Sequence, residues 1–515
     1  MFAITKVALV SLSRTCAADL WPRTYPSVTG PAKIEAGDRD LDNTLHQEDS
    51  EAVDRILLRG GSILSMDEEI GELSSGDVLV EGSRIAAVGP SIAAADAQVV
   101  DAAGMVVMPG MVDGHKHTWQ TIFRATCGDE SLAQFFGEAV PSTAPHMAPS
   151  DVYASNLLGA LDALNGGVTT FLDWCHITVT PDHARAALAG LVESGARAWF
   201  GYGRSLLTWD DRTLDHPADI RAIQREAFPT TSDRVRLAMA ARGPMFADLE
   251  PTRRDFGLAR ELGVPISLHV DMPGYAGNDL VHLDDMGLLG PDVCFLHGNT
   301  LTDHEIDLGR AAGCHFVDSS QLDILMGIGG AITERLLRAG IRPGISPDSI
   351  VANPTDLFWV MRALILLERQ RAYASTFAAD RQPERGHLTA REMLEMATIR
   401  GAEAVWLADE IGSLTPGKQA DIVLLRTNDV AMQPLNDIAT TIVFSASPAH
   451  VDTVLVGGRI VKRGGRIVAV DPDRAIRLAR DARDRVYEAA ARGGYRPRWW
   501  SATHPVSPPV PSSTS

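Results

Sequence analysis

Residues 106–117 read VVMPGMVDGHKH, an apolar run that ends in two histidines separated by one residue. Side chains alternate between the two faces of a strand, so His115 and His117 are expected on the same face. Two adjacent imidazoles suit a divalent metal, although a His-x-His pair alone is a weak signal. We therefore predict a buried strand with a possible metal-binding end, and its interpretation depends on the surrounding sequence.

Strand-like runs alternate with amphipathic helical patterns through the middle of the chain, from residue 105 to residue 405. This alternation predicts a parallel α/β fold, and eight such units in roughly 300 residues are typical of a (β/α)8 barrel, or TIM barrel. A doubly wound open sheet is the alternative, but no GxGxxG follows the first strand. The predicted strands are Val106–Val112, Val168–Asp173, Ala198–Tyr202, Val235–Ala240, Pro265–Val270, Val293–His297, His315–Asp318 and Arg342–Ser346. The predicted helices include Asp182–Ser194, Thr252–Leu262, His304–Ala312 and Ile332–Ala339.

Polar residues stand at the carboxyl ends of later predicted strands as well. His269 ends the fifth strand, His297 ends the sixth, and Asp348 follows the eighth. The carboxyl rim of a (β/α)8 barrel is where catalytic groups gather. We therefore expect these side chains to surround the His115–His117 pair.

The two ends of the globular region share a sequence pattern that differs from the strand–helix alternation of the middle. Short β-rich runs are separated there by glycine turns. We predict one β-sandwich built from residues 53–104 and 406–470, with the barrel of residues 105–405 inserted between them. Residues 1–52 are expected to be a disordered extension. Residues 471–515 are expected to form a C-terminal helix and a disordered tail, whose Trp499 and Trp500 are candidates for docking.

Composition excludes several classes of function. The net charge of −19, without a local Lys/Arg cluster, argues against nucleic-acid binding. No run approaches the roughly 20 apolar residues of a membrane span, and the run Val7–Leu12 is too short for a secretory signal. The five cysteines show no CxxC spacing, which fits a reducing compartment. We expect a cytoplasmic protein that acts on a small molecule, without a nucleic-acid or membrane partner.

Four motifs together resemble the amidohydrolase superfamily. They are Pro109–His117, Gly166–Thr170, Leu296–Asp303 and Gly412–Asp421, and the resemblance covers about residues 55–470. It is strongest to the mononuclear-metal branch that contains cytosine, guanine and S-adenosylhomocysteine deaminases and triazine hydrolases. In combination these motifs are highly specific.

The resemblance implies roles for five residues. His115 and His117 match the paired metal ligands and His269 the third ligand. Asp348 matches the aspartate that touches the metal and accepts a proton from water, and His297 matches the histidine that polarises the substrate. A divalent metal lowers the pKa of bound water toward about 7, which agrees with such a site.

The resemblance also bears on the number of metals. Binuclear relatives usually bridge two metals with a lysine on strand four, and none of the five lysines of this chain falls there. We therefore expect one divalent metal ion, zinc or iron, both of which suit imidazole and carboxylate ligands. A homo-oligomer is expected by resemblance only.

The chain departs from the deaminase branch in one position. Relatives usually carry a glutamate three residues after the strand-five histidine, where this chain has Met272. Asp271 is the candidate replacement for that general acid, with a loop carboxylate as the alternative interpretation. Residues expected to contact the substrate are Trp119, Gln120, Arg124, Trp174, His176 and Met326.

These observations favour a metal-dependent hydrolase that acts on a carbon–nitrogen bond, other than a peptide bond, of a small cyclic or heteroaromatic molecule. Deamination is the leading reaction. The missing glutamate keeps two other reactions open at the same site, namely hydrolytic dechlorination and a non-hydrolytic cyclisation or elimination in a biosynthetic pathway. A catalytically inactive barrel that serves as a scaffold is a further alternative.

Overall fold

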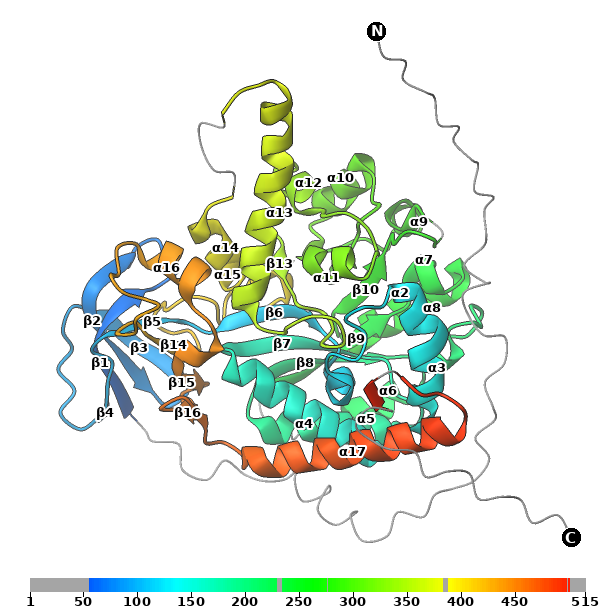
Figure 1. The fold of residues 1–515 in the computed structure, drawn as a ribbon, viewed down its shortest axis with the longest axis horizontal. Helices are drawn as coiled ribbons and strands as arrows, with labels where there is room; N and C mark the ends of the chain where they lie inside the picture. The colour runs from blue at the N-terminus through cyan, green and yellow to red at the C-terminus, as the bar shows by residue number, and fades with distance from the viewer. Residues whose placement is uncertain (1–54, 229–233, 276, 383–387, 498, 501–515) are drawn as a thin grey trace, which may run out of the picture.

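The computed structural model describes residues 55–228, 234–275, 277–382, 388–497 and 499–500 (Figure 1). They form a (β/α)8 barrel and a second sheet built from strands near both ends of the chain. The predicted fold class is therefore confirmed. The expected extension of residues 1–52 and the end of the tail, residues 501–515, lie outside the described residues.

The barrel is an eight-stranded parallel sheet in sequential order from β6 to β13. Its ring closes through a parallel bridge between Lys116 and Asp348, at the ends of the first and last strands. Beside it, the backbone N–H of His117 donates to the carbonyl of Asp348 at 3.2 Å. The strands are β6 (Met111–Lys116), β7 (Val168–Cys175), β8 (Arg197–Gly203), β9 (Val235–Ala241), β10 (Ile266–Val270), β11 (Val293–His297), β12 (His315–Asp318) and β13 (Gly344–Ile345).

Helices follow the strands and cover the outside of the barrel (Figure 1). The four helices predicted from periodicity are present, with ends shifted by three residues or fewer. The longer helices are α4 (Pro149–Asn165), α5 (Pro181–Ser194), α6 (Ile220–Ala227), α8 (Leu249–Leu262), α9 (Asp279–Asp285), α10 (Asp303–Ala311), α11 (Ser320–Leu325), α12 (Thr333–Arg338), α13 (Leu357–Ala378), α14 (Ala390–Met396), α15 (Ile399–Ala404), α16 (Ile438–Ser445) and α17 (Pro472–Arg492). Short helical turns after the strands are η2 (Thr118–Phe123), α2 (Leu132–Gln134), η3 (Phe135–Ala139), α3 (Val140–Thr143), η4 (Ala144–His146), η5 (Leu206–Thr208), α7 (Gly243–Phe246) and η6 (Pro448–His450).

The second sheet has nine strands in the order β17-β16-β15-β14-β5-β1-β2-β3, with β4 also paired to β1. Strands from the two ends of the chain meet where β14 runs antiparallel to β5, with Val423 opposite Met108. Their inward side chains share one core, as the sequence predicted for residues near both ends. The strands are β1 (Arg55–Leu64), β2 (Glu72–Glu81), β3 (Arg84–Gly89), β4 (Gln98–Asp101), β5 (Met105–Pro109), β14 (Ile422–Arg426), β15 (Val451–Val456), β16 (Arg459–Arg463) and β17 (Arg466–Ile467).

The predicted first strand, Val106–Val112, is wrong as a single element. The structure divides this run at Gly110, between β5 in the second sheet and β6 in the barrel. The N–H of Gly110 donates to the carbonyl of Asp421 at 2.8 Å, and a Cβ at this glycine would lie 2.1 Å from Thr169 Oγ1. Both halves are buried, so apolar periodicity alone does not reveal where the chain passes from one sheet to the other.

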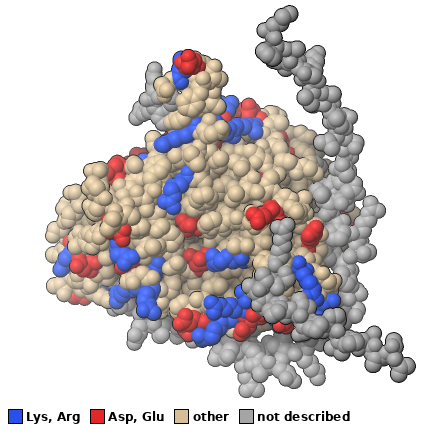
Figure 2. Space-filling model, viewed as in Figure 1, with Lys and Arg blue, Asp and Glu red and all other residues tan. Residues whose placement is uncertain are grey.

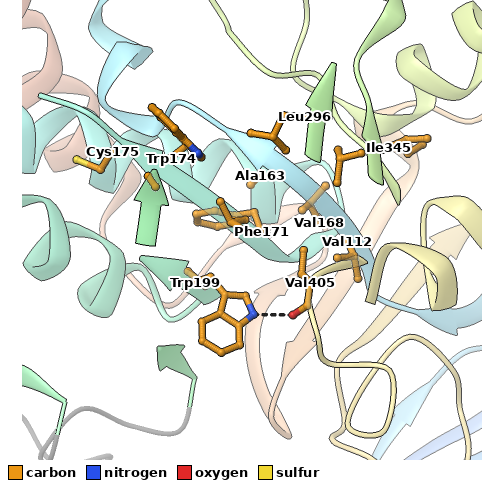
Figure 3. Close-up of a cluster of buried hydrophobic side chains, with 14 of the residues drawn as sticks. Val112, Ala163, Val168, Phe171, Trp174, Cys175, Trp199, Leu296, Ile345 and Val405 are labelled. Carbon is orange, nitrogen blue, oxygen red and sulfur yellow. Dashed lines mark hydrogen bonds between the residues drawn. The ribbon is translucent and has the colours of Figure 1, made fainter. Parts of the chain in front are cut away.

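The core is continuous from the barrel interior to the helical layer. Val112, Phe171, Leu296 and Ile345 come from four different barrel strands and are buried together (Figure 3). Trp199 closes one side of this cluster, and its indole N–H donates to the carbonyl of Val405 at 2.7 Å (Figure 3). This packed interior gives the strand ends a rigid base.

Helix α17 lies along α4 at the lower edge of the barrel in Figure 1. The chain then turns back, and the ring of Trp500 stacks on Tyr487 with centroids 5.3 Å apart. Trp499 contacts the same tyrosine edge-on, at 4.7 Å. The two tryptophans therefore dock against the C-terminal helix.

On the face of the molecule that Figure 2 shows, charged side chains of one sign do not form a large patch. Figure 2 shows Lys and Arg side chains interspersed with Asp and Glu side chains, which agrees with the absence of basic clusters in the sequence. Among the described residues, no helix is both long enough and apolar enough to cross a membrane.

A buried ion pair joins the barrel to the second sheet. Arg197, at the start of β8, donates through Nε and Nη2 to the two carboxylate oxygens of Asp421, at 2.9 and 3.0 Å. The N–H of Gly457 donates to the same carboxylate at 2.8 Å. Both side chains of the pair are about 98–99% buried, so neither charge can be solvated if the other is removed.

We expect Asp421→Ala to lower the free energy of unfolding by about 3–5 kcal/mol, because it removes the carboxylate that pairs with the buried Arg197 guanidinium. Urea denaturation followed by circular dichroism measures this loss. The matched control is Glu226→Ala, which removes the partner of the exposed Arg185 at 2.8 Å and is expected to change stability by less than about 1 kcal/mol. Equal effects of the two substitutions would contradict the prediction.

Candidate metal centre and substrate cavity

Five polar side chains converge at the carboxyl rim of the barrel, as expected for its strand ends. His115 lies on β6, and His117 directly follows it. His269 lies on β10, His297 ends β11, and Asp348 follows β13. The Nε2 atoms of His115 and His117 each lie 3.2 Å from Asp348 Oδ1, and His297 Nε2 lies 3.6 Å from Asp348 Oδ2.

Several of the buried nitrogen and oxygen atoms of these side chains have no hydrogen-bond partner. They include both ring nitrogens of His115, Nδ1 of His269 and Oδ1 of Asp348. Buried polar atoms are normally paired, so an unpaired group of this kind needs an explanation. Ligand atoms of His115, His117 and His269 lie within 4.8 Å of one another, as do those of His115, His297 and Asp348. Imidazole nitrogens and one carboxylate suit a divalent metal ion.

Burial keeps the three candidate ligand histidines neutral. Loss of hydration lowers the pKa values of His115, His117 and His269 well below the usual value, and the neighbouring imidazoles lower them further. A neutral imidazole offers the lone pair that a metal requires. Charge and geometry therefore favour the same use of these side chains.

A hydrogen bond fixes the orientation of the His117 ring, and packing supports that of His269. His117 Nδ1 lies 2.9 Å from the carbonyl of Trp174, so its N–H points there and Nε2 points toward Asp348. Such a contact to the second ring nitrogen is the usual way in which a metal-binding histidine is oriented. Trp174 also packs edge-on against His269, with centroids 4.3 Å apart.

His297 is held by a carboxylate that the sequence analysis did not identify. Its Nδ1 lies 2.8 Å from Oδ1 of Asp323, and Oδ2 of Asp323 accepts from the Asn299 amide at 2.8 Å. Burial alone would lower the pKa of His297, but the carboxylates of Asp323 and Asp348 outweigh it and raise the pKa to about 9. Asp323 lies in α11, after β12, and no sequence motif connects it to His297.

The backbone adopts an unusual conformation at two of the converging residues. His297 and Asp348 have φ angles of 64° and 61°, in the left-handed region that non-glycine residues rarely occupy. Such conformations persist where the surrounding structure enforces them, and they concentrate at functional sites. They turn both side chains toward the centre of the rim.

A cavity opens above these groups, and its empty space, which includes space open to solvent, amounts to about 510 Å³. The polar lining residues are His117, Gln120, His176, His269, His297, Asp348 and Ser349, and the apolar ones are Leu132, Phe135, Phe136, Trp209, Phe246, Met272, Leu322, Met326, Ile328 and Val351.

The structure divides the six predicted substrate contacts into three groups. Gln120, His176 and Met326 line the cavity. Trp119 and Trp174 are fully buried behind it and pack against His176, so they support the lining residues instead of forming the wall. Arg124 lies outside the cavity, where it is half exposed and pairs with Asp162 at 3.4 Å.

Asp271 does not reach the cavity either. Its two carboxylate oxygens accept the backbone N–H groups of Asn278 and Asp279, each at 3.1 Å, at the start of α9. It thus stabilises a loop, which was the alternative interpretation of this residue. The next residue, Met272, lines the cavity in its place.

The residues that the sequence analysis missed belong mostly to segments after the strands. Phe135 and Phe136 come from η3, Phe246 from α7, and Trp209 follows η5. They are far apart in sequence and carry no motif. Only the packing of the loops above the barrel brings them together.

Residues 106–461 match the model of the amidohydrolase family. The chain is 27% identical over 437 residues to a 5'-deoxyadenosine deaminase of Methanosarcina mazei, covering 83% of this chain and 97% of that protein. It is 29% identical over 451 residues to a 5-methylthioadenosine/S-adenosylhomocysteine deaminase of Desulforudis audaxviator, covering 84% of this chain and 100% of that protein.

Two solved structures share the fold. A zinc-bound adenosine deaminase of Xanthomonas campestris superposes with a TM-score of 0.74 at 24% identity, covering 84% of this chain and 98% of that one. A mutant atrazine chlorohydrolase of Arthrobacter aurescens, in complex with zinc and atraton, gives 0.73 at 22% identity, with coverage of 83% and 100%. The family match spans more than half of the sequence and contains all five converging side chains, and we conclude that the chain belongs to the amidohydrolase family.

Proposed function

We propose that the protein is a metal-dependent hydrolase that cleaves a carbon–nitrogen bond, other than a peptide bond, in a small cyclic or heteroaromatic substrate and releases ammonia. The observation that carries this proposal is the convergence of buried, unpartnered imidazole and carboxylate atoms at the base of a cavity. The family match and the deaminase names of the relatives support it.

In this proposal one divalent metal is held by His115, His117, His269 and Asp348. The donor set fits zinc or iron, and the zinc in the two structural neighbours favours zinc. One metal is proposed because β9, the fourth barrel strand, reads VRLAMAA and offers no lysine to bridge a second ion. When bound, the metal would supply an acidified water near neutral pH.

The protein's own groups then have distinct tasks. Asp348 places a carboxylate beside the ligand nitrogens, where it can accept a proton from the attacking water. His297 directs Nε2 toward the same carboxylate and can stabilise charge that develops on the substrate. Asp323 fixes the His297 ring through Nδ1 and acts as a positioning residue.

A second reaction is favoured by Met272. This residue lines the cavity where relatives are expected to carry a glutamate, and Asp271 is occupied at the start of α9. An amine leaves readily only when it is protonated, whereas chloride needs no proton. Hydrolytic dechlorination at the same site is therefore the alternative reaction, and the non-hydrolytic chemistry stays open with it. The intact set of donors argues against an inactive scaffold.

The remaining expectations stay predictions. We predict that the protein is a homo-oligomer and that it works in the cytoplasm. We also predict that its partner is a small-molecule substrate, and not a nucleic acid or a membrane.

Metal content provides the first test. Purified protein is expected to contain about one equivalent of zinc or iron per chain, and His117→Ala is expected to lose it because the ligand set becomes incomplete. Elemental mass spectrometry measures both. His304→Ala is the matched control, because His304 is exposed on α10 and should leave the metal in place. A wild-type protein without metal, even after reconstitution, would contradict the site.

Removal of the metal should abolish the reaction. We expect ammonia release from an aminated heterocycle to stop after chelation and to return when zinc or iron is added back. The same assay with a chlorinated analogue measures chloride. Chloride release without ammonia release would select the alternative reaction, and activity that survives complete chelation would exclude both.

Asp323→Asn should lower kcat by about 10- to 100-fold, the usual effect of removing a group that orients a functional histidine. We expect KM and metal content to change little, because Asp323 touches neither the cavity nor the proposed ligands. Asp307→Asn, an exposed aspartate on α10, is the control. A parallel loss of metal in Asp323→Asn would show that the carboxylate acts through the fold of the site instead.

A further inference from the structure

The lining of the cavity is divided by origin into a polar base and apolar walls. The polar groups lie on the strand ends and in the first residues after them, namely His117, His176, His269, His297 and Asp348, with Gln120 and Ser349 beside them. The walls come from segments further along the loops. Leu132, Phe135, Phe136, Trp209, Phe246, Met326 and Ile328 contribute most of them, and Met272 is an exception that lies two residues after β10.

Among the described residues that line the cavity there is neither a lysine nor an arginine, and Asp348 is the single carboxylate. In the proposed function Asp348 is already used by the metal. His297 faces the carboxylates of Asp323 and Asp348. A charged substituent that lies against the walls of the cavity would therefore meet no side chain of opposite charge. A buried charge without a partner is strongly unfavourable, because it loses its hydration and gains no ion pair in return.

The arginines near the walls are used elsewhere. Arg212 donates to the carbonyls of Pro244 and Met245, each at 2.7 Å, and so holds the α7 segment that carries Phe246. Arg242 is buried and donates to the carbonyl of Asp211 at 2.9 Å. These guanidinium groups stabilise loop backbone and are not among the lining residues.

The groups that remain suit neutral heteroatoms. Ser349 Oγ donates to Oε1 of Gln120, which leaves the amide N–H group of Gln120 as a donor on the cavity wall. His176 lines the cavity beside it and stacks on Trp209, with ring centroids 5.3 Å apart. Aromatic rings of this kind bind flat, apolar ligands.

We propose that this site selects uncharged substrates: an aminated heterocycle whose remaining substituents are apolar, and not one that carries an amino-acid, carboxylate or phosphate tail. The inference rests on the proposed function, because it assumes that the substrate binds above the metal centre. Of the compounds in the relatives' names, the inference favours 5'-deoxyadenosine, which is uncharged, over S-adenosylhomocysteine, which carries an amino-acid tail.

The test uses pairs of ligands that share a heterocycle and differ in whether one substituent carries charged groups; in the melamine pair the two substituents are also nearly equal in size. One pair is 5'-deoxyadenosine and S-adenosylhomocysteine, and the other is ethylmelamine and carboxymethylmelamine. Isothermal calorimetry on the full-length, metal-loaded protein measures binding, and ammonia release is followed in parallel. We expect at least one neutral member to bind and its charged counterpart to bind at least 100-fold more weakly.

The inference is overturned if a charged member binds within threefold of its neutral partner, or if neither neutral member binds. Binding of a neutral ligand without release of ammonia would contradict the proposed reaction and leave the inference standing. Ammonia release from both members of a pair with similar efficiency would support the proposed reaction and contradict the inference about charge. The two proposals therefore fail in different ways.

A charge placed on the wall gives a second measurement. Phe136→Arg puts a guanidinium group into the apolar lining, and we expect it to shift the binding ratio at least tenfold toward carboxymethylmelamine. The matched control is Phe377→Arg, because Phe377 is 57% exposed on α13 and does not line the cavity. An unchanged ratio in Phe136→Arg would count against the apolar wall as the source of selectivity.

Discussion

Closure of the barrel is the constraint on which the rest of the site depends. The parallel bridge between Lys116 and Asp348 joins the end of the first strand to the end of the last, across more than 200 residues of sequence. It brings the His115–His117 pair against the Asp348 carboxylate, with 3.2 Å between the nearest atoms. A slip of one residue in this pairing would turn the histidines away from the rim, because strand side chains alternate between faces.

The converging side chains are unfavourable for the folded chain on its own, since buried imidazoles and a carboxylate lose hydration without complete hydrogen bonding. Such an arrangement is stable when the rigid barrel core enforces it and a cation completes it. The second sheet contributes to that rigidity. Its β5 leads directly into β6, and the buried Arg197–Asp421 pair fixes the base of the barrel to β14.

The proposed function and selectivity assign the chemistry and the choice of substrate to different parts of the molecule. In the proposed function, strand ends supply the metal-binding and proton-accepting groups, whereas the loops after the strands supply Phe135, Phe136, Phe246 and Met272 to the walls. Loops can change without disturbing the barrel, which is why one barrel serves many substrates. The match over residues 106–461 places this chain in its family, and in our proposal the walls decide what it accepts.

Local sequence determined the barrel, the strand ends and the five converging residues, because apolar periodicity and the residue that ends each strand are local properties. Tertiary structure decided what local patterns do not encode. It divided residues 106–112 between two sheets, turned Asp271 toward the start of α9, moved Arg124 outside the cavity, and brought Asp323 to His297. Three of these outcomes depend on contacts between residues distant in the chain, whereas the Asp271 contacts depend on how the loop before α9 folds back. No local sequence pattern specifies them.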